Sequence, residues 1–356
     1  MTRCYVVIAV MSLFAAAARA ERVVLVAGGD EPVGNLPATR SKLDGPFGVD
    51  FNRAGEMFIV EISGHRVMKV DRDGIITRIA GTGEKGSGGD GGPPLAATFN
   101  GMHSLAVAAN GDLYIADTWN NRVRKIDADL GKISDCVGTG ENGFAGDGGP
   151  ARDAQCGGVF CVALDANGQQ LYLADLNNRR IRRVDLNDNT ITTIAGNGKP
   201  GIPTDGSMAT SAPLVDPRAV AVDSKGNVYV LERGGHALRV VDTSGTIRTV
   251  AGCGKPGFEG DGGDALKAKL RGPKHICIDR DDSVLIADTD NHVIRRYLPA
   301  EGKIVRVAGT GKKGDRGLGG PPDELEMNQP HGVCVDAAGV LFIVDSYNNR
   351  VLKIVD

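Results

Sequence analysis

Phe47, His103, Phe160, Arg218, Lys274 and His331 occupy one repeated position in the chain, two residues before the hydrophobic start of a predicted strand. Arginine and lysine are cationic donors, and the two histidines are expected to add positive charge below about pH 6.5. Cationic donors that converge on one space favour a carboxylate-bearing ligand or another small anion. Histidine also binds zinc, so His103 and His331 are candidate metal ligands, although a catalytic zinc site normally takes three protein ligands.

A repeated stretch of about 57 residues must position these side chains. Its second copy reads LYIADTWNNRVRKID, and the acidic residue of that motif returns at intervals of 56 to 58 residues. The acid stands at Glu61, Asp117, Asp175, Glu232, Asp288 and Asp345. In the second unit, strands are predicted at 105–107, 113–116, 122–126 and 133–137, with an Asn-Gly turn in the first hairpin. Four short antiparallel strands in each unit are typical of a β-propeller blade.

The ends of the chain predict six blades in an all-β fold. The last unit stops after three strands, and its missing fourth strand is matched by residues 22–28, which resemble residues 192–196 and 248–252. An N-terminal strand that completes the last blade would close the ring and leave no free sheet edge. The first strand of each blade is innermost, so we expect the six repeated residues to rim the mouth of the central channel.

Glycine-rich connections between blades begin at Gly81, Gly138, Gly196, Gly252 and Gly309. They are predicted to share one face with the loop that follows the second strand of each blade. Binding residues concentrate in loops that a rigid scaffold positions. Trp119 and Tyr347 stand in this second set of loops and are candidate contacts for a partner on the loop face.

The repeated acids could form a ring of metal or catalytic carboxylates, but a structural role is favoured because they recur in every unit. They would cap loop amides and pair with an arginine five residues later. Glu232 and Asp288 lack that arginine, so they are expected to contribute less to stability. Four loop aspartates could ligate calcium or simply form turns. These are Asp90, Asp147, Asp205 and Asp261.

The motif residues resemble the NHL repeat family. Asp288-Thr-Asp-Asn291-His292 matches the first part of its signature, and Asp117 to Val123 matches the whole with asparagine in place of histidine. The resemblance implies a propeller but little about activity, since function in the family is diverse. A binding scaffold for a protein or a small anion is favoured. The alternative is a lactonase, another hydrolase or a lyase, because related propellers include lyases with histidine-bound zinc and calcium-dependent lactonases.

Residues 1–20 have the form of a signal peptide, with Arg3, an apolar run over 5–17, and Ala18-Arg19-Ala20 at the cleavage site. The predicted mature chain is the propeller of residues 21–356, exported to the periplasm or secreted, with no membrane span and as a monomer. Two of the 41 basic residues lie before residue 21, which leaves 39 against 44 acidic ones, a net charge of −5. This balance argues against nucleic-acid binding.

Overall fold

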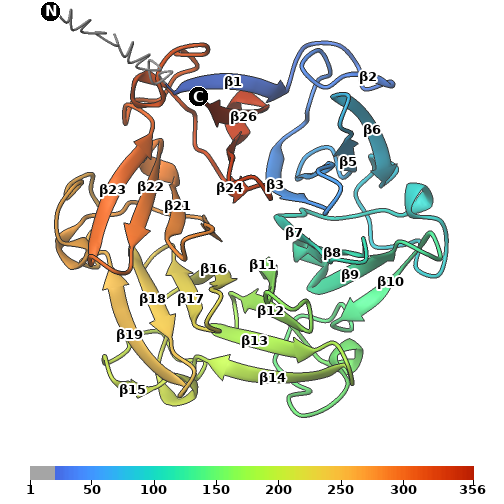
Figure 1. The fold of residues 1–356 in the computed structure, drawn as a ribbon. Coiled ribbons are helices and arrows are strands. Elements are labelled where there is room, and N and C mark those ends of the chain that lie inside the picture. Colours follow the sequence, from blue (N-terminus) through green and yellow to red (C-terminus); the bar gives the residue numbers. More distant parts are fainter. Residues whose placement is uncertain (1–20) are drawn as a thin grey trace, which may run out of the picture.

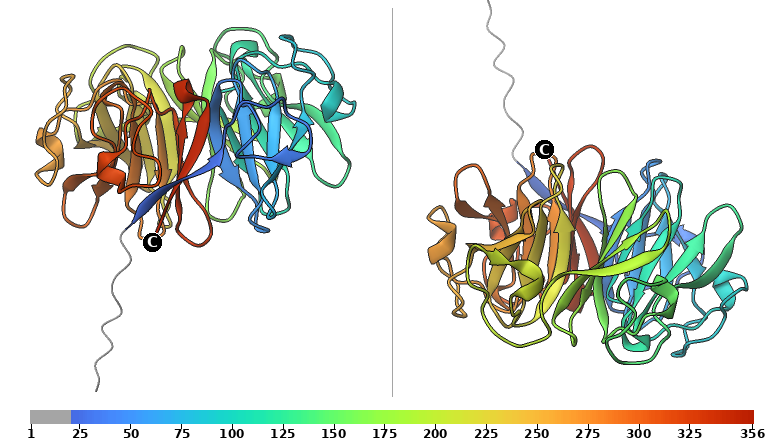
Figure 2. Two further views of the ribbon diagram at one scale, coloured as in Figure 1. Left: turned by 90° about the horizontal axis from the view of Figure 1, so that it is seen from above. Right: turned by 90° about the horizontal axis from the view of Figure 1, so that it is seen from below.

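The computed structural model describes residues 21–356, which form six antiparallel sheets arranged around a central axis (Figure 1). Seen from the side, the sheets form a short cylinder with connections at both faces (Figure 2). No helix in this part of the chain is long and apolar enough to cross a membrane. The predicted signal peptide, residues 1–20, lies outside the described residues. The all-β, six-bladed propeller predicted from the repeats is confirmed.

Blades 1 to 3 follow one another along the chain, each running from the axis outward. Blade 1 comprises β3 (Pro46–Phe51), β4 (Met57–Glu61), β5 (Val67–Val70) and β6 (Ile75–Ala80), with the short β2 (Leu36–Pro37) on its outer edge. Blade 2 comprises β7 (Ser104–Val107), β8 (Leu113–Asp117), β9 (Arg122–Asp127) and β10 (Lys132–Val137). Blade 3 comprises β11 (Val159–Leu164), β12 (Gln170–Asp175), β13 (Arg180–Asp185) and β14 (Thr190–Ala195).

Blades 4 to 6 complete the ring. Blade 4 comprises β16 (Pro217–Val222), β17 (Val228–Glu232), β18 (Ala237–Val241) and β19 (Thr246–Ala251), with β15 (Ser207–Met208) outside them. Blade 5 comprises β20 (His275–Ile278), β21 (Val284–Asp288), β22 (Val293–Leu298) and β23 (Lys303–Ala308). Blade 6 comprises β24 (Gly332–Val335), β25 (Leu341–Asp345), β26 (Arg350–Val355) and β1 (Arg22–Ala27).

The N-terminal strand closes the ring as predicted. β1 pairs antiparallel with β26, with Arg22 opposite Val355 and Ala27 opposite Val351. Figure 1 shows the blue first strand lying against the red last strand. Strands from the two ends of the chain therefore share one sheet, and β26 has a partner on both sides.

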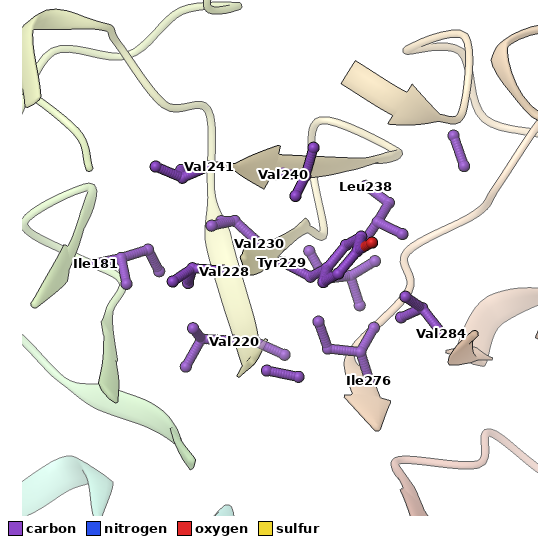
Figure 3. Close-up of a cluster of buried hydrophobic side chains, with 14 of the residues drawn as sticks. Ile181, Val220, Val228, Tyr229, Val230, Leu238, Val240, Val241, Ile276 and Val284 are labelled. Carbon is purple, nitrogen blue, oxygen red and sulfur yellow. The ribbon is translucent and has the colours of Figure 1, made fainter. Parts of the chain in front are cut away.

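Apolar side chains between neighbouring blades form the core. Figure 3 shows one such cluster, in which Ile181 of blade 3, Val220 and Tyr229 of blade 4, and Ile276 and Val284 of blade 5 meet. Burial of this surface is the main force that holds one blade to the next. Near the axis the strands approach closely, and a Cβ at Gly48 would lie 2.9 Å from the Cα of Ser104 in blade 2. Only glycine fits at that point.

Short 3₁₀ helices lie on the connections and not within the sheets. Three follow the second strand of a blade: η2 (Thr118–Asn120), η6 (Thr289–Asn291) and η8 (Ser346–Asn348). Five lie between blades: η1 (Pro94–Ala96), η3 (Ala151–Asp153), η4 (Ala209–Ser211), η5 (Ala265–Lys267) and η7 (Pro322–Glu324). The residue four places after the repeated acid has a left-handed backbone, φ 46–56°, in every blade. Histidine or asparagine stands there in five blades, and Asn and His are enriched in that conformation.

Candidate functional site

The structure places the six predicted mouth residues in one ring at the start of the inner strands. Phe47 lies between the two histidines, with its ring centroid 5.2 Å from that of His103 and 4.1 Å from that of His331. His103 packs in turn on Phe160, with the centroids 4.7 Å apart. These four rings, from blades 6, 1, 2 and 3, form a continuous aromatic arc around the mouth. Phe47 and both histidines are buried, so these rings expose little of their surface to solvent.

The two remaining positions of the ring, in blades 4 and 5, are cationic. The guanidinium carbon of Arg218 lies 4.3 Å from the centroid of the Phe160 ring, a cation–π contact. Lys274 Nζ lies 3.1 Å from His331 Nε2 and 3.8 Å from the Asp290 carboxylate. Arg218 is 4% exposed. Within residues 21–356 its side chain forms no hydrogen bond or ion pair, and its Nε is buried without a partner.

The two histidines do not supply the positive charge expected of them near pH 6.5. Burial, together with Arg218 and Lys274, lowers the pKa of both His103 and His331 well below 6.5. His331 Nδ1 lies 2.8 Å from the carbonyl oxygen of Gln329. A carbonyl only accepts, so Nδ1 carries the proton and Nε2 accepts from the Lys274 ammonium. Among the six ring residues, Arg218 and Lys274 therefore carry the positive charge.

A cavity of about 640 Å³ adjoins the ring on the loop face over blade 1. Its walls include Phe47 from the ring, together with the two predicted loop contacts, Trp119 and Tyr347. Trp119 is 51% exposed and Tyr347 59% exposed. Trp119 packs edge-on against His103 at a centroid distance of 5.7 Å, and the Tyr347 ring packs against His331 in a tilted arrangement at 5.6 Å. The exposed aromatics thus extend the aromatic arc outward, and the cavity was not predictable from strand positions.

The repeated acids are buried and hold the loops of the mouth in place. Each accepts a hydrogen bond from the backbone amide of a residue just ahead of the inner strand of its own blade, as Asp117 does from Asn100 at 2.8 Å. The same bond recurs in all six blades. Burial raises the pKa of Asp288 to about 7. The predicted capping role is confirmed, and these carboxylates lie at the ends of second strands, not on the mouth.

The expectation that Glu232 and Asp288 lack an arginine partner is wrong. Arg239 lies 2.7 Å from the Glu232 carboxylate, and Arg295 lies 3.3 Å from that of Asp288. Both arginines stand seven residues after the acid rather than five. The third strand begins two residues before them. Two further residues along a strand return a side chain to the same face, so either spacing delivers a guanidinium to the acid.

Three of the four candidate calcium ligands in the glycine-rich loops pair with buried arginines instead. Asp90 Oδ1 lies 2.7 Å from Arg124 and Asp261 Oδ1 2.7 Å from Arg295. Asp147 pairs likewise with Arg182 at 2.8 Å, whereas Asp205 accepts from the amide and hydroxyl of Thr249. Asp90, Asp147 and Asp261 thus anchor their connections to the third strand of a blade, and Asp205 anchors its connection to the fourth strand, β19.

A metal ion at the mouth does not fit the residues that surround it. The described chain brings no three histidine, cysteine or acidic side chains together in a metal-binding arrangement. His331 Nε2 already accepts from Lys274, and Arg218 carries a second positive charge in the same ring. Two cations beside a candidate ligand oppose the binding of a third. We therefore derive no chemistry through zinc or calcium at His103 and His331.

Comparisons with known proteins agree with the fold. The NHL repeat model matches residues 99–126 and 327–354, and the teneurin NHL domain model matches residues 184–258. A chloroplast protein of Arabidopsis thaliana, suppressor of quenching 1, is 27% identical over 79% of the chain, which spans 27% of that protein. NHL repeat-containing protein 2 of Bos taurus is 24% identical over 90% of the chain, which spans 47% of it. The chain thus spans less than half of either relative.

Solved structures show the same architecture at low identity. An auxiliary nutrient binding protein from Bacteroides thetaiotaomicron covers 94% of the chain with a TM-score of 0.67 and 16% identity, over 76% of its own length. Virginiamycin B lyase from Staphylococcus aureus covers 94% of the chain with a TM-score of 0.52 and 15% identity, over 99% of its own length. Both likenesses concern the fold alone. The repeated Asp-to-Arg motif, the six blades and the family-model matches at residues 99–126 and 327–354 show that the chain contains NHL repeats arranged as a six-bladed propeller.

Proposed function

We propose that this protein is an exported binding protein whose ligand lies on the loop face, in the cavity beside the channel mouth. The observation that carries the proposal is the pair of half-exposed aromatic side chains, Trp119 and Tyr347, on the wall of the 640 Å³ cavity. Large aromatic side chains placed around a hollow are typical of ligand and protein interfaces.

The position of Trp119 is set by the backbone beneath it. Gly101 has a left-handed backbone with φ 67°, and a Cβ there would collide with the indole ring. The indole therefore lies against the glycine while its other side is open to solvent. A side chain that is held in place but half exposed loses little conformational entropy when a ligand packs on it.

Two further features support binding in an exported protein. The fold is shared with a structure described as a nutrient binding protein, and the first twenty residues have the form of a signal peptide. A lyase or hydrolase, the alternative function, would depend on a metal at His103 and His331, which the surrounding cations disfavour. Binding without catalysis is therefore the function we propose.

The test is a thermal-shift screen of the mature protein against a fixed panel of amino acids, dipeptides, sugars, nucleotides and organic acids. A Trp119→Ala, Tyr347→Ala double variant removes the exposed aromatics, and Leu130→Ala, an exposed apolar residue in the β9–β10 turn of blade 2, serves as control. We expect at least one compound to raise the melting temperature of the wild type and of the control but not of the double variant. A panel without hits, or hits that survive the double substitution, would refute the proposal.

A further inference from the structure

Arg218 is a buried cation without a counter-ion. It is 4% exposed, its Nε has no partner, and no carboxylate of residues 21–356 lies within ion-pair distance of it. An isolated buried charge is costly unless it is paired or hydrogen-bonded. Burial lowers the pKa of Arg218 to about 9, which is the direction expected for a guanidinium that lacks an anion.

The other buried arginines of the chain show that Arg218 is different. Arg124, Arg182 and Arg295 are fully buried, and each pairs with a loop aspartate at 2.7 or 2.8 Å. These arginines also donate to backbone carbonyls. Each of these three buried guanidinium groups is therefore paired with a carboxylate that offsets its charge. Arg218 has no such carboxylate partner among residues 21–356, and it lies in the ring at the channel mouth.

The groups around Arg218 leave the mouth short of negative charge. Lys274, in the next blade, lowers the pKa of His331 as Arg218 does, and its nearest acid, Asp290, is 3.8 Å away. Arg233, another nearby cation, is neutralised by Asp216 at 2.9 Å. Two blades thus present cationic donors, while the other four present the aromatic arc. The mouth is therefore cationic on the side of blades 4 and 5 and aromatic on the opposite side.

We propose that the ligand bound at this face is a small organic carboxylate with an aromatic body. The carboxylate would take hydrogen bonds from Arg218 and Lys274, and the aromatic body would stack on the arc that runs from Phe47 to Trp119 and Tyr347. This inference rests on the proposed binding function and names the ligand class. Arginine suits the carboxylate because its planar donors match the two oxygens.

The experiment uses the single tryptophan of the chain, Trp119, as a reporter. The probes are benzoate, phenylacetate and 3-phenylpropionate, the amide of each, and acetate, titrated into the mature protein while tryptophan emission and heat are recorded. We expect an aromatic carboxylate to change the emission, and its amide and acetate to bind about tenfold or more weakly, since a charged hydrogen bond is lost in one case and stacking in the other.

Variants test the assignment of Arg218 and Lys274. Arg218→Gln and Lys274→Gln should each weaken the best carboxylate about tenfold or more, whereas Lys255→Gln, an exposed lysine of a glycine-rich loop, should leave it unchanged. Arg218→Gln should also melt at the same temperature as the wild type or higher, because it removes an uncompensated buried charge. A structural role for Arg218 would instead lower its melting temperature.

The outcomes separate this inference from the binding function. Amides that bind as tightly as acids, or Arg218→Gln and Lys274→Gln variants that bind like the wild type, would overturn the carboxylate assignment and leave binding at this face intact. If no carboxylate binds while other compounds of the thermal-shift panel do, the ligand class is likewise wrong. If no compound of either panel binds, the binding function itself fails.

Discussion

Glutamate replaces aspartate as the repeated acid in blades 1 and 4 only, and in both blades glycine stands three residues later. A Cβ at Gly64 would collide with the Glu61 carboxylate, and one at Gly235 would lie 2.7 Å from Glu232 Oε2. In the other four blades the acid is aspartate, and an asparagine at that position donates to it and to the glycine-rich loop, as Asn120 does. The longer acid and the missing side chain compensate for each other.

This exchange predicts a coupled pair of substitutions. Gly64→Asn alone should lower the free energy of unfolding by about 1–3 kcal/mol, because the new side chain overlaps the Glu61 carboxylate. Combining it with Glu61→Asp should recover most of the loss by recreating the arrangement of blade 2. Urea denaturation of the four proteins of this cycle measures the coupling, and additive effects would mean that the two positions are independent.

Asp50 on β3 is a second residue whose environment has a measurable consequence. Its carboxylate accepts from the amides of Val107 in the next blade and of Phe51, and burial raises its pKa from 3.8 to about 6. Between these values the folded protein binds the proton more tightly than the unfolded chain. The contribution of Asp50 to stability is therefore larger at acidic pH and declines as the pH rises through this range.

We therefore expect the wild type to lose stability relative to Asp50→Asn by about 1–3 kcal/mol between about pH 4 and pH 7. The other acids titrate in both proteins, so the difference isolates Asp50. Urea denaturation at the two pH values gives the result. A difference between the two proteins that does not change with pH would show that Asp50 ionises normally.

At the scale of the blade, a buried arginine links the second-strand acid, the third strand and the glycine-rich loop. Arg295 contacts Asp288, Asp261 and the carbonyl of Lys269. Blade 4 is built differently, since Arg239 pairs with Glu232 and donates to Thr249, while Asp205 binds only Thr249. The two blades therefore offer a matched comparison of the same loop with and without its ion pair.

Asp261→Ala should lower the free energy of unfolding by about 3–5 kcal/mol, because it leaves the guanidinium of Arg295 with only one acidic partner in a buried site. Asp205→Ala removes hydrogen bonds from a threonine and should cost about 1–2 kcal/mol. Chemical denaturation of both variants tests the order. Equal losses would show that the aspartates act only as turn formers.

The strands were predictable to within about one residue. Apolar and polar residues alternate within strands, and the motif returns about every 57 residues, so both patterns can be read from the sequence. The strands predicted at 105–107 and 122–126, for example, are β7 (Ser104–Val107) and β9 (Arg122–Asp127). The arginines seven residues after the acid were missed, since only the spacing of five was compared. The unpaired state of Arg218 depends on what surrounds it in space, and so no spacing could reveal it.

For the whole molecule, β1 determines how the ring closes. Deleting residues 21–29 should expose the outer edge of β26 and remove the buried Val23 and Ala27. We expect the melting temperature to fall by more than about 5 °C, with aggregation through the free edge. Calorimetry against the chain that begins at Glu21 provides the comparison, and equal melting temperatures would show that β1 is dispensable.

Because β1 pairs with β26, blade 6 is built from both ends of the chain. β1 comes from the N-terminus, and β24, β25 and β26 come from the C-terminus. Since Arg22 lies opposite Val355, a tight turn could join the two ends, and the chain could be reopened at the exposed Lys312 and Lys313 between blades 5 and 6. Every blade of such a circular permutant would be one uninterrupted run of chain, and no shared strand would hold the first blade to the last. Side-chain packing and loop hydrogen bonds, such as that from the amide of Thr310 to the carbonyl oxygen of Leu325, would remain. Its unfolding would measure how much the shared strand contributes to the ring, with the composition of every blade unchanged.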